Sequence, residues 1–219
     1  MVKPLNPLDA QIRAIFLAEI RHGSASAQTL HDEMGYSAEV WRRILSDLLR
    51  DGLVRPLEPQ AAGQNKVTGI GYVLTEKGRS MLKVVLTGGV FDIIHVGHVS
   101  TLEEARKLGD ILVTVVARNE TVQRLKNRKP VNDEETRLQV VKALKPVDLA
   151  LLGDPQDAYR IVRKVGPDII ALGYDQKEDE QSLQKALKRM GLRTRVVRLS
   201  SYIPGVKTSR IISLIREEQ

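Results

Sequence analysis

The chain contains no cysteine, which excludes disulfide bonds, thiolate nucleophiles and cysteine-ligated zinc. Aromatic residues make up only 4% of the chain, so we expect a core built mainly from Val, Ile, Leu and Ala. No apolar run reaches the length of a transmembrane helix, and the first residues, MVKPLNPLDAQ, lack the pattern of a signal peptide. These absences favour a cytoplasmic protein that has no membrane partner.

Positive charge is present in excess, and it is unevenly distributed. The formal net charge is +7, yet the first 80 residues hold 10 basic and 9 acidic side chains. Nearly all of the excess therefore lies after residue 80. A basic region attracts anions such as phosphates, nucleotides and nucleic acids, so we expect an anionic partner for this second part of the chain.

The first 80 residues are predicted to form three helices followed by a β-hairpin. Apolar residues at helical spacing, with Ser37 as a cap and Gly35 and Gly52 at helix ends, indicate helices over residues 8–20, 26–35 and 37–52. Two alternating segments, LVRPLEP and GIGYVLT, are typical of strands, and the polar segment QAAGQNKVT joins them.

From Lys83 onward, apolar strand-like runs alternate with amphipathic segments. This alternation predicts an α/β domain with a doubly wound parallel sheet, whose ligands bind at the carboxyl ends of the strands. The expected boundaries are residues 1–82 for the first domain and 83–219 for the second. We expect strands over residues 83–89, 110–117, 147–153, 168–175 and 194–199, and helices over 99–110, 133–144, 156–167, 180–191 and 208–218.

The segment TGGVFDIIHVGH follows the first strand of the second domain and leads into a helix. Gly88 and Gly89 allow backbone N–H groups to approach a phosphate closely. His95 and His98 lie three residues apart around Gly97, so both rings can face one anion. Fixed donors at this place suit nucleotidyl transfer, in which charge gathers on the attacked phosphate and no enzyme nucleophile is needed.

Other interpretations of these motifs are weaker. Histidines near a helix start are often caps or surface groups. The His-x-x-His pair lacks the glutamate and third ligand of a zinc site, so we predict no metal held by protein side chains. A G-x-G-x-x-G turn is absent, and GVKTS resembles the end of a P-loop without its upstream glycine.

GGVFDIIHVGH is similar to the GxFDxxHxGH signature of the cytidylyltransferase-like nucleotidyltransferases. The resemblance extends over residues 83–219, because the basic segment 113–148, the strand-end motif ALGYDQ and the segment KTSRII all follow in the family's order. It implies a Rossmann-like fold of the HxGH type, in which a nucleotide and a phosphorylated acceptor meet at the histidines.

The resemblance also implies roles for individual residues. His95 and His98 would hold the α-phosphate and its transition state, while Lys129 and Arg137 would reach the phosphates. Lys126 is a weaker choice than Lys129, because the sequence does not rank the cations of this segment. Asp92 either orients its loop or only caps a turn. The residues expected to bind the nucleotide or acceptor are Thr87, Gly88, Gly89, Val90, Phe91, Asp92, Gly173, Asp175, Thr208 and Ser209.

Within the family, the run from KPVNDEETR to ALGYDQ is most similar to the archaeal FAD synthases, which transfer AMP from ATP to FMN. The alternative is transfer from CTP to a small phospho-alcohol such as glycerol-3-phosphate. Mg²⁺ is expected to accompany ATP. Two features depart from the pattern: Lys207 stands where a serine is common, and the chain lacks the C-terminal cysteines frequent in the archaeal enzymes.

The first domain resembles a winged helix-turn-helix domain. The similarity is carried by the short helix ending at Gly35, the longer helix starting at Ser37, and the segment YVLTEKGRSML. It implies that residues 37–51 form a recognition helix with Arg42, Arg43 and Arg50 available to DNA. The nearly neutral charge leaves docking or homodimerisation as alternatives. A DNA-binding regulator that uses the second domain as a ligand sensor also stays open.

Overall fold

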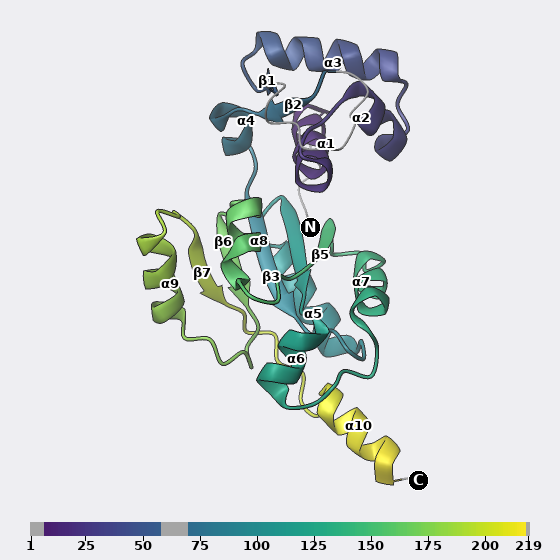
Figure 1. The fold of residues 1–219 in the computed structure, drawn as a ribbon, viewed down its shortest axis with the longest axis vertical. Helices are drawn as coiled ribbons and strands as arrows, with labels where there is room; N and C mark the ends of the chain where they lie inside the picture. The colour runs from purple at the N-terminus through teal and green to yellow at the C-terminus, as the bar shows by residue number, and fades with distance from the viewer. Residues whose placement is uncertain (1–6, 58–69, 218–219) are drawn as a thin grey trace. The chain divides into compact units, whose positions relative to one another are not determined.

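A computed structural model describes residues 7–57 and 70–217. The chain divides into two compact units, Met1–Leu82 and Lys83–Gln219, here called the N-terminal and C-terminal units. Each has its own sheet (Figure 1). Within the described ranges, no helix is long and apolar enough to cross a bilayer.

The N-terminal unit consists of helices and a two-stranded antiparallel sheet. The predicted helices are confirmed to within a few residues, and Val54 pairs with Leu74 in the hairpin. The predicted joining segment 60–68 lies outside the described residues. The elements are α1 (Pro7–His22), α2 (Ala27–Met34), α3 (Ala38–Arg50), β1 (Val54–Pro56), β2 (Tyr72–Leu74) and α4 (Glu76–Ser80).

Local sequence explains where α2 and α3 begin and end. Ser26 caps α2 in a reciprocal capping box with Thr29, and Ser37 caps α3. Gly35 ends α2 in the left-handed conformation with φ 76°, which costs glycine little. The two helices are therefore joined by only three residues. Trp41 anchors α3, because its side chain is only 2% exposed.

The C-terminal unit contains a five-stranded sheet in the order β5-β4-β3-β6-β7, and every pair in it is parallel. This arrangement confirms the predicted doubly wound α/β fold. The strands are β3 (Val84–Gly89), β4 (Ile111–Val116), β5 (Leu149–Leu152), β6 (Ile169–Leu172) and β7 (Arg195–Arg198). The helices are α5 (Val96–Arg106), α6 (Asn119–Lys126), α7 (Glu134–Lys142), α8 (Ala158–Val165), α9 (Glu180–Arg189) and α10 (Thr208–Glu217).

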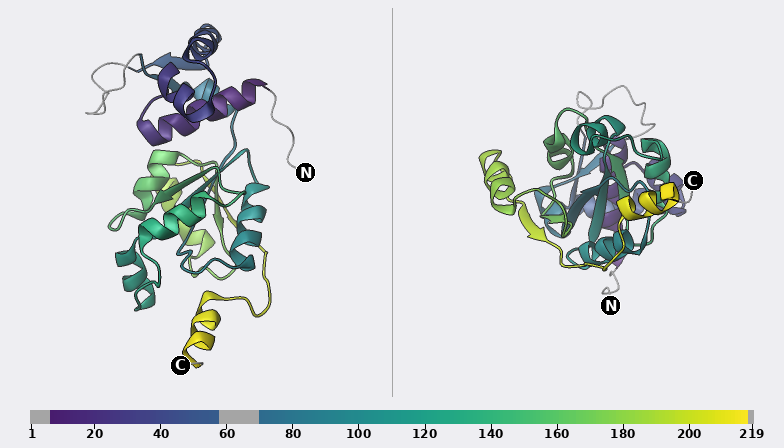
Figure 2. Two further views of the ribbon diagram at one scale, coloured as in Figure 1. Left: turned by 90° about the vertical axis from the view of Figure 1, so that its right-hand side faces the viewer. Right: turned by 90° about the horizontal axis from the view of Figure 1, so that it is seen from below.

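Buried aliphatic residues hold the sheet and its helices together. Leu102 of α5 and Val141 of α7 are fully buried in one cluster with Val85, Leu112 and other strand residues. Each such side chain contributes about 1.5–3 kcal/mol by leaving water. In contrast, α10 lies apart from the other helices of the unit, at the end of the segment that follows β7 (Figure 2).

The strand order places a topological switch point between β3 and β6. From β3 the chain moves outward through β4 to β5, then returns to β6 on the other side of β3. Thr87 pairs with Ala171 across this boundary. Ligands of doubly wound sheets bind at the carboxyl ends of the strands at such a point.

Two predicted helix boundaries are wrong in detail. The structure begins α5 at Val96 instead of residue 99 and ends it at Arg106 instead of residue 110. The end comes early because Gly109 packs tightly against the start of β3, where an added Cβ would lie 2.4 Å from the carbonyl oxygen of Lys83. Helix α6 was not predicted, since its segment was interpreted only as a basic stretch.

Candidate active site

The two histidines lie at the N-terminus of α5, directly after the loop that follows β3. His95 is the N-cap residue, and its side chain makes no capping hydrogen bond. The two imidazole rings stack with centroids 3.9 Å apart and an interplanar angle of 22°. An added Cβ at Gly97 would lie 3.1 Å from the His95 ring, so glycine leaves space for this arrangement.

Within the described part of the chain, each of the two histidines has a buried ring nitrogen without a hydrogen-bond partner. The Nδ1 atoms of His95 and His98 are buried and have no hydrogen-bond partner among the described residues. Burial lowers the pKa of His95, and burial together with the adjacent His95 lowers the pKa of His98 to about 4. Asp175 opposes both shifts. Buried nitrogens without partners are unusual in folded proteins, and catalytic sites are one of the places where they occur.

The loop before the histidines is held in a strained conformation at Phe91. This residue has φ 52°, in the left-handed region that bulky side chains rarely adopt. Its ring is 6% exposed and lies 5.4 Å from the ring of His98. Gly89 makes room for it, because an added Cβ there would lie 2.9 Å from the Phe91 ring.

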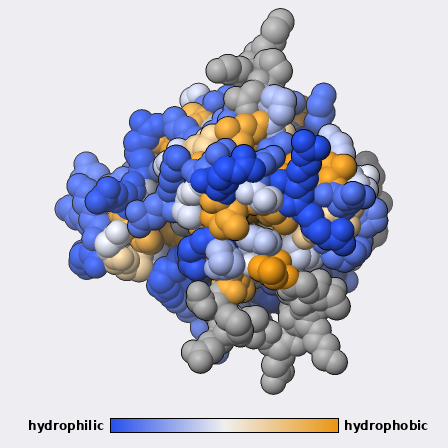
Figure 3. Space-filling model, turned by 90° about the horizontal axis from the view of Figure 1, so that it is seen from above, coloured by the Kyte–Doolittle hydropathy of each residue, from blue (hydrophilic) through white to orange (hydrophobic). Residues whose placement is uncertain are grey.

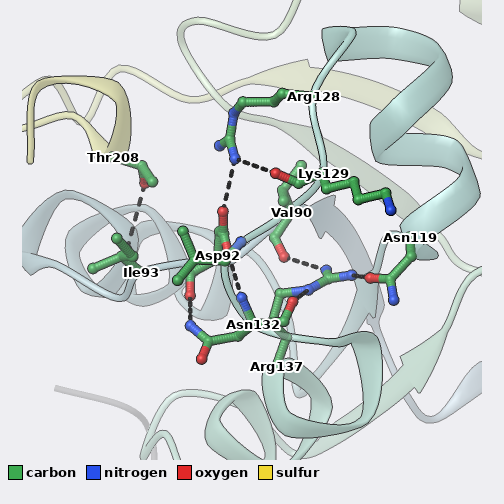
Figure 4. A network of polar contacts seen from close by, with 10 residues as sticks. Val90, Asp92, Ile93, Asn119, Arg128, Lys129, Asn132, Arg137 and Thr208 are labelled. Carbon is green, nitrogen blue, oxygen red and sulfur yellow. Dashed lines mark hydrogen bonds and ion pairs between the residues drawn. The ribbon is translucent and has the colours of Figure 1, made fainter. Parts of the chain in front are cut away.

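Asp92 is the centre of the polar network drawn in Figure 4. Its carboxylate accepts from the guanidinium of Arg128 at 2.9 Å and from the amides of Val131 and Asn132 at 2.8 and 3.0 Å. Burial alone would raise the pKa of Asp92, but these hydrogen bonds lower it below its ordinary value. This geometry is compatible with both predicted roles of Asp92, orienting its loop and capping a turn, because the carboxylate connects its own loop to residues 128–132.

Arg137, which the resemblance implies would reach the phosphates, is buried and hydrogen-bonded to protein acceptors in this structure. Its side chain is 1% exposed, and its guanidinium donates to the carbonyl of Val90 at 2.6 Å, Asn119 Oδ1 at 2.8 Å and the carbonyl of Asn132 at 3.1 Å. Helix α7 directs this cation into the interior (Figure 4). It joins the histidine loop, the start of α6 and the loop before α7.

Thr87 and Gly173 also have partners within the protein. The buried hydroxyl of Thr87 donates to the carbonyl of Ala171 at 2.9 Å, so it links β3 to β6 instead of facing a nucleotide. The amide of Gly173 donates to Gln176 Oε1, and the Gln176 side-chain amide donates to the carbonyl of Gly88 at 2.7 Å. Gln176 thus crosses the switch point.

The structure separates the four cations that the sequence could not rank. Arg124 donates to the carbonyl of Pro155, and Arg128 pairs with Asp92. Lys126 and Lys129 are both exposed, and Lys126 is close enough to His98 to contribute to the lowering of its pKa. In Figure 4 the Lys129 side chain extends from the loop without a marked contact. The two lysines are therefore the available cations of this segment.

The remaining predicted residues come from two later segments. Asp175 is exposed after β6 and interacts electrostatically with both histidines. Thr208 and Ser209 are the first residues of α10, and the Thr208 hydroxyl donates to the carbonyl of Ile93 at 3.4 Å. The chain thus brings the start of α10 next to the loop that precedes the histidines.

The donor set near the histidines does not form a metal cage. Among the described residues, no three His, Asp or Glu side chains come together as metal ligands do. Asp92 is already committed to Arg128, which leaves the exposed Asp175 as the acidic group near the histidines. A divalent cation that arrives with a triphosphate would fit this set, because Mg²⁺ often takes one protein carboxylate together with phosphate oxygens.

In the N-terminal unit, Arg42, Arg43 and Arg50 all lie on the exposed surface of α3. Arg50 pairs with Asp47 of the same helix. Figure 3 shows mostly hydrophilic side chains on this side of the molecule, with hydrophobic ones between them. The exposed hydrophobic side chains of α3 are Val40 and Leu49, at 45% and 43%.

Several residues around the site were not predicted from the sequence. Asn119 and Asn132 bind Arg137, and Gln176 reaches Gly88. Their only signal was proximity to a motif, since the contacts of Asn119 and Gln176 join residues 18 and 88 positions apart and the Asn132 contact depends on how α7 directs the Arg137 side chain. Gln176 is the fourth residue of the GYDQ segment, and only this position within a motif could have pointed to its role.

Comparisons with known proteins support this description of the C-terminal unit. A family model described as cytidylyltransferase-like matches residues 86–215, more than half of the chain. The FAD synthase of Aciduliprofundum boonei is 54% identical over 122 residues, which cover 56% of this chain and 80% of that protein. The FAD synthase of Thermoplasma volcanium is 45% identical over 142 residues, covering 63% of this chain and 99% of that protein.

A solved structure gives the same result for the fold. It is described as a lipopolysaccharide core biosynthesis protein from Thermoplasma volcanium, and it is 47% identical with a TM-score of 0.54. The match covers 56% of this chain and 99% of the other. With its parallel sheet, its histidine pair at the switch point and these relatives, the chain is a nucleotidyltransferase that belongs to the cytidylyltransferase-like family.

Proposed function

We propose that the chain transfers AMP from ATP to FMN and releases pyrophosphate, so that FAD is formed at the His95–His98 pair. The stacked histidines with unpartnered ring nitrogens at the switch point are the observation that carries this proposal. Relatives named FAD synthase, at 45–54% identity, support ATP and FMN as the substrates. They do not favour the CTP-dependent alternative or a domain that acts only as a sensor.

The reaction is an in-line displacement at the α-phosphorus of ATP. A phosphate oxygen of FMN forms the new P–O bond, and the bond to the β-phosphate breaks, so pyrophosphate leaves with its electron pair. Negative charge grows on the oxygens of the α-phosphate during this step. His95 and His98 donate hydrogen bonds to these oxygens, and their fixed stacking means that little reorganisation is needed in the transition state.

The leaving phosphates are held by groups from two sides of the histidine pair. Lys126 and Lys129 supply positive charge from α6 and the loop after it. Thr208 and Ser209 supply hydroxyl groups at the N-terminus of α10, where the helix dipole favours an anion. Lys207 precedes this terminus and adds a further exposed cation.

Arg137 and Asp92 act by holding the loop that carries the glycines. Asp92 accepts hydrogen bonds from main-chain amides, and Arg137 donates to main-chain carbonyls, so each connects loops around the site. We therefore assign them positioning roles. Mg²⁺ would come with the triphosphate, near Asp175, where it would neutralise phosphate charge.

The test is pyrophosphate release by the purified full-length chain in the presence of Mg²⁺. ATP and CTP are each combined with FMN, with glycerol-3-phosphate, or with buffer alone. We expect release only with ATP and FMN, together with stoichiometric FAD by chromatography. Release only with CTP and glycerol-3-phosphate would contradict the proposed substrates but still support the proposed site. No release from any combination would contradict the whole proposal.

For the N-terminal unit we propose DNA binding through α3. The observation that favours it is the three-residue connection containing Gly35 between α2 and α3, which is typical of a helix-turn-helix. Arg42 and Arg43 are exposed on α3 and make no ion pair within the described part of the chain. Phosphate contacts of this kind make affinity fall steeply with salt.

Fluorescence anisotropy with a labelled duplex tests this second role. We expect binding at low salt that weakens as salt rises, and a smaller salt dependence in Arg42→Ala and Arg43→Ala. Arg50→Ala is the matched control, because Arg50 already pairs with Asp47. No binding at low salt, or equal loss in all three variants, would contradict DNA binding through this face.

A further inference from the structure

Two tyrosines that the proposed mechanism does not use lie together beside the site. Tyr174 follows β6, and Tyr202 lies in the segment between β7 and α10. Their rings meet edge to face, with centroids 5.1 Å apart and an interplanar angle of 68°. Tyr202 is 54% exposed. In such an arrangement the edge of one ring covers the face of the other, and a ring face remains open to a further aromatic group.

Tyr174 has a fixed position relative to the switch point. The main chain on either side of it is held by Arg198, whose guanidinium donates to the carbonyls of Gly173 and Gln176 at 3.0 and 2.8 Å. Gln176 in turn donates to the carbonyl of Gly88 in the loop after β3. Tyr174 is therefore tied to the glycine loop that is proposed to contact the nucleotide.

The residue after Tyr174 connects it to the reacting centre. Asp175 interacts electrostatically with both His95 and His98. Tyr174 is the immediate neighbour of Asp175 in the chain, so the tyrosine pair belongs to the same segment after β6 that supplies this charge.

Tyr202 is fixed from the other direction, by the helix that carries the histidines. Glu104 of α5 accepts hydrogen bonds from the amides of Ser200 and Ser201 at 3.0 and 2.7 Å, and from the Ser200 hydroxyl at 3.0 Å. Burial would raise the pKa of Glu104, but these donors lower it, so the carboxylate stays charged. The segment leading to Tyr202 is therefore pinned onto α5.

We propose that Tyr174 and Tyr202 form a stacking surface for the flat heteroaromatic ring of a substrate. The inference rests on the proposed function, because ATP and FMN each bring such a ring, the adenine and the isoalloxazine. Tyrosine suits this role because it offers a large, rigid apolar face with few rotatable bonds. Stacking of a base on one aromatic side chain typically changes affinity by about fivefold to a hundredfold.

The experiment measures initial rates of FAD synthesis by the full-length chain and by Tyr202→Leu and Tyr202→Phe. FMN is varied at saturating ATP, and ATP is varied at saturating FMN. We expect Tyr202→Leu to raise the KM of one substrate about tenfold while kcat changes little, and Tyr202→Phe to stay near the parent. A rise for FMN assigns the isoalloxazine to the surface, and a rise for ATP assigns the adenine.

Tyr36→Leu is the matched control, because Tyr36 is 60% exposed and lies in the other unit. Circular dichroism checks that each variant is folded. If both KM values of Tyr202→Leu stay within about twofold of the parent, or if Tyr36→Leu raises the same KM equally, the proposal is overturned. Tyr174→Phe and Tyr174→Leu repeat the comparison at the other ring should Tyr202→Leu fail to fold.

Direct binding separates failure of this inference from failure of the proposed function. Calorimetry without turnover measures FMN alone and ATP alone against the parent and Tyr202→Leu. If the parent makes no FAD, the proposed function fails, yet a tenfold weaker binding of either ligand to the variant still supports the stacking surface. Equal affinities in parent and variant, or no binding of either ligand to the parent, overturn it.

Discussion

The two units of this chain use buried polar groups in different ways. In the N-terminal unit the buried polar residues among those described are Ser24 and Ser26, and Ser26 serves the cap of α2. In the C-terminal unit Asp92 and Arg137 are buried near the carboxyl ends of the strands, where each joins several loops. Because burying a charge is costly unless it is fully hydrogen-bonded, the second pattern holds the loops at this edge of the sheet in one arrangement.

The comparison extends to the relatives. The matched family model covers residues 86–215, within the C-terminal unit. The FAD synthase of Thermoplasma volcanium is matched over 99% of its length by 142 residues, so it has no room for counterparts of both units. The chemistry thus belongs to the C-terminal unit, and the N-terminal unit is an addition whose effect on the reaction can be measured separately.

The largest expected effect is that of removing a ring from the histidine pair. His98→Ala and His95→Ala should each lower kcat by about 10²–10³, as loss of a fixed oxyanion donor does in other enzymes. Trp41 is the only tryptophan and lies in the N-terminal unit, so its fluorescence follows that unit alone during unfolding. We expect the unfolding transition followed by Trp41 fluorescence to be unchanged in both histidine variants. Rates near the parent in both variants would remove the histidines from the mechanism.

A second contrast is between a buried and an exposed arginine. Arg137→Ala should lower the free energy of unfolding of the C-terminal unit by about 3 kcal/mol, because three acceptors lose their partner. Arg50→Ala in the N-terminal unit should change stability by less than about 0.5 kcal/mol, because exposed ion pairs contribute little. Urea unfolding followed by circular dichroism and by Trp41 fluorescence separates the two units.

If Arg137 is a positioning residue, its loss should also be partly reversible. Added guanidinium at low millimolar concentration is expected to restore part of the kcat of Arg137→Ala and none of that of His98→Ala. An Arg137→Ala protein with parental stability and a raised KM for ATP alone would instead indicate a direct contact with the substrate.

A third difference between the units should appear with pH. The folded C-terminal unit binds a proton at His98 more weakly than the unfolded chain, since the pKa falls from 6.5 to about 4. The free energy of unfolding should therefore decrease as the pH drops from about 6.5 towards 4, by about 2 kcal/mol between pH 7 and pH 5. His98→Gln should lack most of this decrease. An identical pH dependence in parent and variant would show that His98 is not its source.

The smallest effect is expected from removing residues 1–80. The C-terminal unit has its own core, and a relative without room for the N-terminal unit carries the name FAD synthase. Steady-state rates of FAD formation should thus be nearly unchanged. A folded but inactive fragment, checked by circular dichroism, would show that the reaction depends on the N-terminal unit.

Local signals predicted most of the secondary structure. Ser37 and Gly35 define helix ends through their own backbone and side-chain chemistry, and the apolar runs of β3 and β6 follow from burial on both faces. Helix α6 was missed because its segment, NETVQRLK, contains few apolar residues. The start of α5 was placed too late because Gly97 in its first turn has low helix propensity.

The meeting of the two histidines could be predicted from the sequence, but the contacts around them could not. His95 and His98 lie three residues apart, so their proximity is a local matter. The partners of Arg137 are 5, 18 and 47 residues away in the chain, and only the packing of α7 decides that the guanidinium turns inward. The same holds for Thr87, whose hydroxyl bond to Ala171 depends on the pairing of β3 with β6.

The close approach of Phe91 to Gly89 has a consequence for how this loop can change over evolutionary time. A side chain at position 89 would overlap the Phe91 ring, and the left-handed backbone at Phe91 places that ring there. A substitution at 89 is therefore tolerable only after 91 has become small, whereas 91 can shrink first. The two positions form an epistatic pair with a preferred order of mutation, which a double-mutant cycle between Gly89→Ala and Phe91→Ala would reveal as strong non-additivity.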